Sequence, residues 1–184
     1  MRIVLVGPPG AGKGTQGERI TGRLHVPRIV VGDLLRRHIT ARTPLGERAS
    51  GYVERGELVP DHLVVGIVEQ ELEPHTSGFV LDGFPRSVAQ ARMLDRFLGI
   101  RGAELDVALH FDIPDAVLAG RLVARGRDDD TPAVIATRLD AFRAQEEALL
   151  AHYRGRVVEV DAVGDVDDVF ERVLWGLRES LLAA

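Results

Sequence analysis

The sequence predicts an α/β fold in which a parallel five-stranded sheet carries helices on both faces. The first observation is a series of short apolar runs, at residues 2–6, 28–31, 78–82, 105–113 and 156–162. The second is a series of stretches with helical spacing between them, at 13–24, 33–42, 45–54, 61–73, 87–98, 114–125, 131–153 and 166–182. Apolar runs that alternate with helical stretches are typical of strands buried on both sides.

Composition narrows the class of protein. The chain has 184 residues, of which 45% are hydrophobic and 28% charged, as in an ordinary globular domain. Its net charge of −5 argues against nucleic-acid binding, although local arginine clusters can still bind a small anion. The chain has no cysteine, which excludes disulfides and cysteine-ligated zinc, and we expect no zinc.

The sequence gives no sign of membrane insertion or secretion. No stretch approaches the ~20 apolar residues of a membrane span. The apolar run that follows Arg2 leads into Gly-Pro-Pro-Gly, which does not resemble a signal-peptide cleavage site. We therefore expect a cytoplasmic protein without a membrane partner.

A glycine-rich segment, GPPGAGKGT, follows the first apolar run and opens a helical stretch. Gly7, Gly12 and Lys13 satisfy the pattern G-x-x-x-x-G-K, in which backbone N–H groups and a helix N-terminus hold phosphate oxygens. Lys13 is the only lysine among 23 basic residues, and a compact ammonium is not interchangeable with a guanidinium at a tight phosphate site. The alternative is a glycine-rich turn without a ligand.

The residue after Lys13 is Gly14, and the hydroxyl comes one position later, at Thr15. A direct hydroxyl ligand to Mg²⁺ is therefore not assured. The metal would be held largely through waters and the nucleotide's own oxygens.

Four segments occur in the order GPPGAGKGTQ, GDLLR, GELVPD and GFVLDGFPRSVAQA. Together they resemble the adenylate kinases among the nucleoside monophosphate kinases, over residues 2–169. The resemblance implies transfer of the γ-phosphoryl group of Mg-ATP to AMP, giving two ADP. It also implies one P-loop NTPase-type kinase domain over 1–184, a helical NMP-binding segment over 30–59 and a short lid loop over 126–132. We expect a monomer.

The chemistry agrees with the many arginines. The acceptor phosphate is already ionised near neutral pH, so the reaction needs no protein base, and catalysis reduces to alignment and charge neutralisation. By resemblance, the ATP-binding residues are Gly10, Ala11, Gly12, Lys13, Gly14, Thr15, Arg121, Arg125 and Gly164. The AMP-binding residues are Val31, Arg36, Glu57, Leu58, Val59, Gly83, Phe84, Pro85, Arg86, Gln90, Arg127 and Arg138. The catalytic residues are Lys13, Arg86, Arg125, Arg127 and Arg138.

Acidic residues supply the remaining expectations. Asp82 ends an apolar run near the phosphate loop and is expected, with Thr15, to orient waters around Mg²⁺. Asp129 and Asp130 either match the family's acidic pair after the lid or are carboxylates that favour a helix N-terminus.

Val30 and Val31 depart from the family, which usually has Ser-Thr here. We expect Val31 to face AMP and Val30 to lie in the core. Valine cannot hydrogen-bond, so one contact of ~0.5–1.5 kcal/mol to the adenine side would be lost. AMP would then bind less tightly, and selectivity among monophosphates would be looser.

Three other functions remain possible. One is a kinase for UMP, CMP or a deoxynucleoside monophosphate on the same scaffold; the Ser-Val-Ala-Gln that follows Arg86 favours adenine. Another is a small-metabolite kinase, such as a shikimate or gluconate kinase. The phosphate loops of those kinases end in Gly-Lys-Ser/Thr, and this ending is absent here. The last is a nucleotide sensor without turnover, against which Lys13, Asp82 and the arginines argue.

Overall fold

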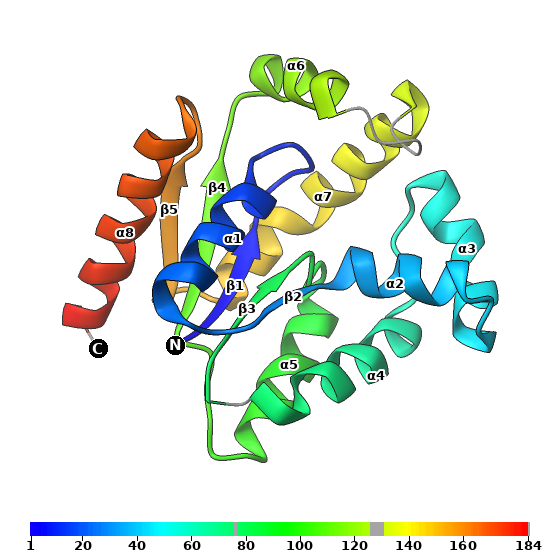
Figure 1. The fold of residues 1–184 in the computed structure, drawn as a ribbon, viewed down its shortest axis with the longest axis horizontal. Helices are drawn as coiled ribbons and strands as arrows, with labels where there is room; N and C mark the ends of the chain where they lie inside the picture. The colour runs from blue at the N-terminus through cyan, green and yellow to red at the C-terminus, as the bar shows by residue number, and fades with distance from the viewer. Residues whose placement is uncertain (76, 126–130, 184) are drawn as a thin grey trace.

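The computed structural model describes residues 1–75, 77–125 and 131–183. It confirms the predicted α/β fold: the strands form one parallel five-stranded sheet in the order β2-β3-β1-β4-β5 (Figure 1). The strands are β1 (Arg2–Val6), β2 (Arg28–Val30), β3 (Phe79–Asp82), β4 (Val107–Asp112) and β5 (Val157–Asp161). All of the strands therefore end at the same edge of the sheet, which is where ligands bind in such folds.

The helices follow the predicted stretches to within about two residues at their ends. They are α1 (Lys13–Leu24), α2 (Val31–Thr40), α3 (Pro44–Arg55), α4 (Asp61–Leu72), α5 (Val88–Gly99), α6 (Asp115–Arg125), α7 (Pro132–His152) and α8 (Val166–Ala183). A 3₁₀ turn at Glu73–His75, which was not predicted, follows α4. None of the described helices is both long enough and apolar enough to cross a bilayer.

Side-chain caps fix the starts of three helices. The Thr43, Ser87 and Thr131 hydroxyls accept hydrogen bonds from backbone N–H groups of the first turns of α3, α5 and α7. Proline follows the cap directly in α3 and α7, where its missing N–H costs nothing. These local signals explain why the predicted helix starts were close to the observed ones.

Four strands are shorter than predicted, by one to three residues each, and two of these differences have identifiable reasons. The strand predicted over 105–113 begins only at Val107, because the Asp106 carboxylate accepts hydrogen bonds from the backbone N–H and the guanidinium of Arg2. The strand predicted over 28–31 ends at Val30, and Val31 is the first residue of α2. The side chain of Val31 therefore follows helical geometry.

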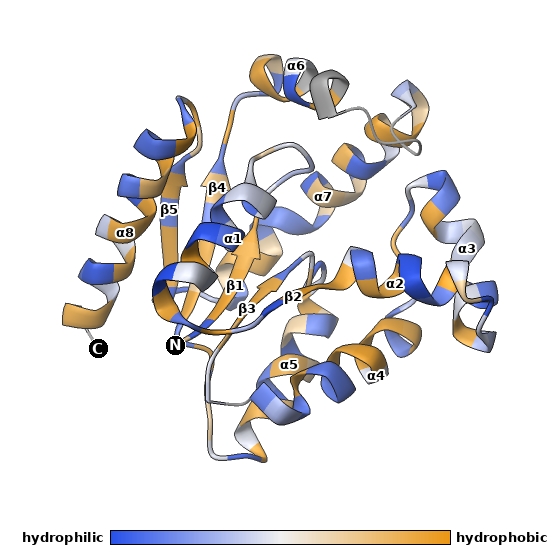
Figure 2. Ribbon diagram, in the orientation of Figure 1, coloured by the Kyte–Doolittle hydropathy of each residue, from blue (hydrophilic) through white to orange (hydrophobic). Residues whose placement is uncertain are grey.

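The sheet separates two hydrophobic core clusters. Val4 and Val6 belong to the first, together with side chains of α4, α5 and α7. Ile3 and Leu5 belong to the second, together with side chains of α1 and α8. This alternation along β1 is the pleat of a strand buried on both faces, and Figure 2 shows the strands as the apolar centre of the molecule.

The helices α2, α3 and α4 extend to one side of the sheet (Figure 1). The first turn of α3 approaches α2 closely at Gly46, where a Cβ atom would lie 2.1 Å from the backbone oxygen of His38. Gly66 in α4 is the opposite case, because it is exposed and a Cβ atom there would meet nothing within 4 Å.

We predict that Gly46→Ala destabilises the protein by about 1–3 kcal/mol, since neither backbone can move without repacking α2 against α3. Gly66→Ala is the matched control and should stabilise by up to about 1 kcal/mol, because alanine favours a helix interior. Urea denaturation of both variants measures the difference. Equal effects in the two variants would contradict the close approach at Gly46.

Candidate active site

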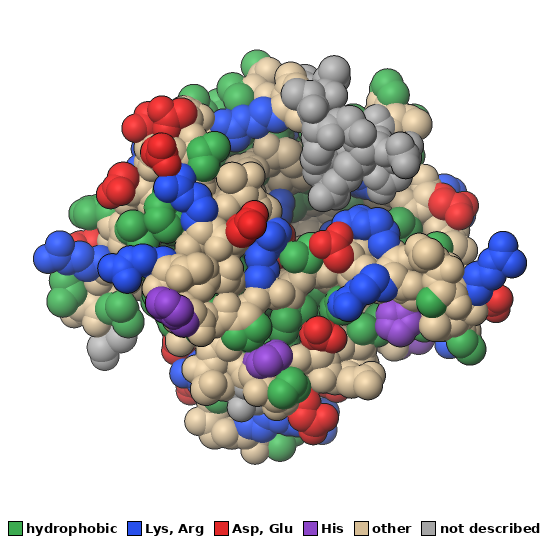
Figure 3. Space-filling view, in the orientation of Figure 1, with side chains coloured by type: hydrophobic (Ala, Val, Ile, Leu, Met, Phe, Trp, Pro, Cys, Tyr) green, Lys and Arg blue, Asp and Glu red, His purple; other side chains and the backbone are tan. Residues whose placement is uncertain are grey.

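A large cavity lies where the strands end. Its volume is about 950 Å³, at the upper end of the ~300–1,000 Å³ typical of small-molecule sites. The phosphate loop and α1 form one wall, and α2, α7 and the start of α5 contribute to the others. Figure 3 shows this hollow with basic side chains along it. Although the net charge of the protein is negative, Lys and Arg side chains gather along this cavity.

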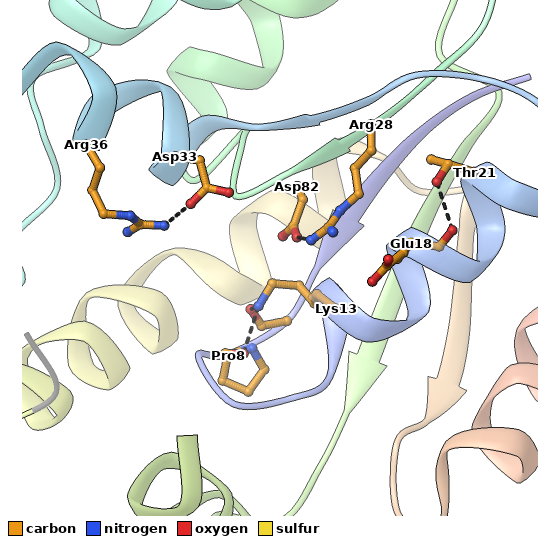
Figure 4. Close-up of polar contacts among 9 residues, drawn as sticks. Pro8, Lys13, Glu18, Thr21, Arg28, Asp33, Arg36 and Asp82 are labelled. Carbon is orange, nitrogen blue, oxygen red and sulfur yellow. Dashed lines mark hydrogen bonds and ion pairs between the residues drawn. The ribbon is translucent and has the colours of Figure 1, made fainter. Parts of the chain in front are cut away.

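The phosphate loop has the geometry of an anion site. Gly12 precedes α1 with φ 91°, a left-handed conformation that favours glycine, and α1 has neither a side-chain cap nor an acid in its first turn. No carboxylate within the first turn of α1 therefore competes for its first N–H groups. The Lys13 ammonium folds back over the loop and donates to the oxygens of Gly7, at 2.7 Å, and Pro8, at 2.8 Å (Figure 4).

The loop after β5 lies beside the phosphate loop. Arg121 on α6 donates to the backbone oxygens of Ala162, at 3.0 Å, and Gly164, at 3.4 Å. Gln16 on α1 donates to the Val166 oxygen at 2.9 Å. These bonds bring Arg121 and Gly164, both predicted on the ATP side, into one corner of the cavity.

Three guanidinium groups converge on the other side of the phosphate loop. Arg36 comes from α2, Arg86 from the loop before α5, and Arg138 from α7, and all three line the cavity. Arg86 is exposed by its accessible surface and is one of the residues that line the cavity. The Arg86 Nε donates to the Gly83 oxygen at 2.8 Å, which fixes the guanidinium near the end of β3.

The pKa of the Arg86 guanidinium is lower than its usual value. Desolvation lowers the pKa of its guanidinium, and the positive charges of Arg138 and Arg36 lower it further. Asp82 acts in the opposite direction. Arginine remains charged in proteins, so the charges of Arg36 and Arg138 repel that of Arg86. A phosphate with two negative charges is the natural counter-ion for such a cluster.

Two carboxylates lie near these cations. Asp33 pairs with Arg36 three residues along α2. Asp82, at the end of β3, is 7% exposed and pairs with Arg28 of the neighbouring strand, with 2.7 Å between the guanidinium and the carboxylate (Figure 4). Strand register places Val30 opposite Asp82, so Arg28 reaches along the sheet beside α1.

Arg28 is a cavity residue that sequence reasoning missed. A Cβ atom on Gly17 would lie 3.0 Å from its Nε, and one on Gly14 would lie 3.2 Å from its Nη2, so the two glycines leave room for the guanidinium. The available signal was a charged residue at the start of a strand that ends near Asp82.

The donor set near the loop fits a hydrated Mg²⁺. The Asp82 carboxylate and the Thr15 hydroxyl both line the cavity. Mg²⁺ usually keeps several waters and combines one or two carboxylates with substrate phosphates. A metal that arrives with a nucleotide would find the carboxylate of Asp82 and the hydroxyl of Thr15 on one wall.

The amide of Gln90 is 2% exposed and lies at the cavity wall. Its oxygen accepts from the Arg86 N–H at 2.8 Å, and its nitrogen donates to the Asp61 carboxylate at 2.7 Å. Asp61 is a second residue that sequence reasoning missed, since nothing local links it to Gln90.

The burial of Val30 and Val31 differs from the expectation. Val31 is 2% exposed and belongs to the first core cluster, although it also lines the cavity. Val30, expected in the core, is half-buried and lines the cavity as well. The helix that begins at Val31 explains the change, because it breaks the alternation of β2.

Most of the predicted nucleotide-binding residues meet at this cavity. The lining includes Gly10, Ala11, Gly12, Lys13, Gly14, Thr15, Arg121 and Gly164 of the ATP set, and Val31, Arg36, Glu57, Leu58, Val59, Gly83, Pro85, Arg86, Gln90 and Arg138 of the AMP set. Phe84 differs, because its ring is 1% exposed and packs in the first core cluster. Arg125 is the last residue of α6, but its side chain, together with Arg127, Asp129 and Asp130, lies outside the described part of the chain.

Comparison with known proteins agrees with the geometry. Residues 5–158 match the family described as adenylate kinase. The adenylate kinase of Nocardia farcinica is 49% identical over 179 residues, covering 96% of this chain and 99% of the relative. The adenylate kinase of Mycolicibacterium smegmatis is 46% identical over 181 residues, covering 97% and 100%. That of Mycobacterium tuberculosis is 45% identical over 179 residues, covering 96% and 99%. With the fold, the phosphate loop and the arginine cluster in place, this chain belongs to the adenylate kinase family.

Proposed function

We propose that this protein is an ATP:AMP phosphotransferase, which reversibly transfers the γ-phosphoryl group of Mg-ATP to AMP and gives two ADP. The observation that carries the proposal is one cavity with an anion-binding loop on one wall and three convergent guanidinium groups on another. Two phosphate-binding regions that share one cavity are what transfer between two nucleotides requires.

The donor side is formed by the phosphate loop. The N–H groups at the start of α1 and the Lys13 ammonium would hold the β- and γ-phosphates. Arg121 and Gly164 would meet the adenine of ATP, where the guanidinium can stack on the base. Arg125, predicted from the resemblance, would also contact the ATP phosphates.

The acceptor side is formed by the arginine cluster. Arg36 and Arg86 would hold the AMP phosphate, and Arg138 would reach the transferring group. Arg127 has the same proposed role by resemblance. Because the attacking phosphate is already anionic, these groups act by aligning the two phosphates and by neutralising charge that repels them.

Mg²⁺, when bound with ATP, supplies further neutralisation of the phosphate charge. Asp82 and Thr15 would orient its waters. Arg28 shares Asp82 in the free protein, so it limits the negative charge next to the phosphate loop.

The remaining assignments concern the base of AMP and the segments of the chain. Gln90 and the backbone at Glu57–Val59 would contact the adenine of AMP. Residues 30–59 would form the NMP-binding segment, and residues 126–132, of which 126–130 lie outside the described part of the chain, would form a short lid loop. We infer a monomeric, cytoplasmic enzyme, in keeping with the composition.

A different acceptor base on the same scaffold is the main competing function, and Val31 is the feature that favours it. A coupled assay with ATP and a panel of AMP, UMP, CMP and deoxynucleotides tests both. Turnover with AMP as the best acceptor supports the proposal. Turnover only with a non-adenine monophosphate rejects it, and no turnover with any monophosphate favours a sensor.

Lys13→Met should lower kcat by at least about 10²-fold, because an ammonium that neutralises transferring phosphate is lost. Its thermal midpoint should change far less. Arg23→Met, an exposed change at the other end of α1, is the control and should keep normal turnover. Turnover and thermal unfolding of both variants provide the test; parallel loss of fold and activity in Lys13→Met would refute the assigned role.

Arg86→Ala should lose activity while ATP binding survives, since Arg86 is assigned to the AMP side. We expect the Kd for ATP, measured by calorimetry, to stay within about threefold, whereas the KM for AMP rises by roughly tenfold or more, as for a lost charged hydrogen bond. Arg92→Ala, an exposed change on α5, serves as control. A collapse of ATP affinity would show that the AMP-side assignment is wrong.

Val31→Thr should lower the KM for AMP by roughly two- to tenfold, the equivalent of one neutral hydrogen bond. Without AMP the buried hydroxyl should lower the thermal midpoint, because it would be desolvated. Val30→Thr is the matched comparison on the neighbouring residue. An unchanged KM in Val31→Thr means that this side chain is packing only, and a gain in Val30→Thr instead would assign the contact to its neighbour.

A further inference from the structure

The carboxamide of Gln90 is held by two partners that cannot exchange roles. Its oxygen accepts from the backbone N–H of Arg86 at 2.8 Å, and its nitrogen donates to the Asp61 carboxylate at 2.7 Å. A carboxylate can only accept and a backbone N–H can only donate. Turning the amide by 180° would set oxygen against carboxylate and NH₂ against N–H. The chemistry of the partners therefore determines which end of the amide is oxygen.

Asp61 is itself fixed in place. It is the first residue of α4, and its second carboxylate oxygen accepts from the Ser87 hydroxyl at 3.4 Å. Ser87 is the N-cap of α5, whose hydroxyl accepts from the Gln90 N–H at 3.2 Å. Asp61, Ser87 and Gln90 thus join the start of α4 to the start of α5. The amide can turn only if this junction is disrupted.

The amide keeps one N–H and one oxygen lone pair beyond these two bonds. An amide has two donors and two acceptor sites, and the Arg86 N–H and the Asp61 carboxylate use one of each. Gln90 lines the cavity, so the remaining pair is available to a ligand there. The order of donor and acceptor along this edge is set by the orientation of the amide.

That order distinguishes two kinds of purine. Adenine carries an amino donor at position 6 beside an acceptor nitrogen, whereas a 6-oxopurine carries an acceptor oxygen beside an N–H donor. An amide in one orientation complements the first edge, and the same amide turned over complements the second. A site that hydrogen-bonds its substrate discriminates strongly, since the wrong ligand leaves buried groups unpaired.

We propose that Asp61 is a positioning residue that determines purine selectivity, because it locks the Gln90 amide in the orientation that accepts a 6-aminopurine monophosphate and rejects a 6-oxopurine monophosphate. The inference deepens the proposed function and rests on AMP as the acceptor. Asp61 itself does not line the cavity and acts only through Gln90.

The test compares AMP with IMP, its 6-oxo counterpart, in Asp61→Asn. An asparagine can donate or accept, so it tolerates both orientations of Gln90, and only the Arg86 N–H still opposes the turn. We expect the ratio of kcat/KM for AMP over IMP to fall about tenfold, equivalent to ~1.4 kcal/mol. The change should appear in KM, with the kcat for AMP and the Kd for ATP unaltered.

Glu47→Gln is the matched control. It also removes a carboxylate from a first helical turn, that of α3, although Glu47 is exposed and Asp61 is half-buried, and the described contacts of Glu47 do not include Gln90. Its AMP-over-IMP ratio should equal that of the wild type. An equal fall in both variants would mean that helix stability, and not the amide, sets the ratio, and would overturn the inference.

A double-mutant cycle tests whether Asp61 acts through Gln90. In a Gln90→Ala background, Asp61→Asn should leave the AMP-over-IMP ratio unchanged, because no amide remains to turn. Asp61→Ser, whose hydroxyl also donates or accepts, provides a second variant if Asp61→Asn folds poorly. A folded Asp61→Asn or Asp61→Ser with the wild-type ratio overturns the inference, as does an effect that persists without Gln90.

Calorimetric Kd values for AMP and IMP separate this inference from the proposed function. If the wild type binds AMP more tightly than IMP but transfers no phosphoryl group, the proposed function fails and the selectivity argument is still tested by binding. If it phosphorylates AMP but Asp61→Asn keeps its preference in both assays, only the inference fails.

Discussion

Repulsion among positive charges is the constraint on which the rest of this structure depends. Arg36, Arg86 and Arg138 come from three separate elements. Desolvation lowers the pKa of Arg86 most, and the positive charges of Arg138 and Arg36 lower it further. Such a cluster opposes folding, so the scaffold must hold it against that repulsion. The ion pairs of Asp33 and Asp82 offset part of the charge. An entering phosphate would add further negative charge to the cluster.

The sheet, which is packed on both faces, holds the site together against this repulsion. β1 places alternate side chains into two separate hydrophobic clusters, so its position is determined from both faces. The phosphate loop follows β1 directly, and Asp82 ends the adjacent β3. The loop and this carboxylate therefore inherit the rigidity of the most buried part of the molecule. By contrast, Arg36 stands on α2, which extends to the side of the sheet. Its position depends on packing between helices.

How far the sequence predicts this protein depends on how local each signal is. The phosphate loop, the helical stretches and the apolar strands are local patterns, and they were predicted nearly at their observed bounds. Strand order is a choice among non-local pairings, which periodicity does not determine. The pairs Arg28–Asp82 and Asp61–Gln90 span 54 and 29 residues and leave no local trace. Val31 shows a further limit: a shift of the helix start by two residues changed which valine is the more buried. The convergence of the arginines was expected only from the family resemblance.

The contacts of Lys13 have a consequence for the kind of molecule that can enter the loop. In the free protein its ammonium is solvated by the protein itself, through the carbonyl oxygens of Gly7 and Pro8. A ligand must replace two good acceptors, so a neutral group gains almost nothing by the exchange. An anionic oxygen gains, because hydrogen bonds between charged partners are roughly twice as strong as neutral ones. The loop thus selects for anions, because a ligand must bind the Lys13 ammonium more strongly than the loop's own carbonyl oxygens do.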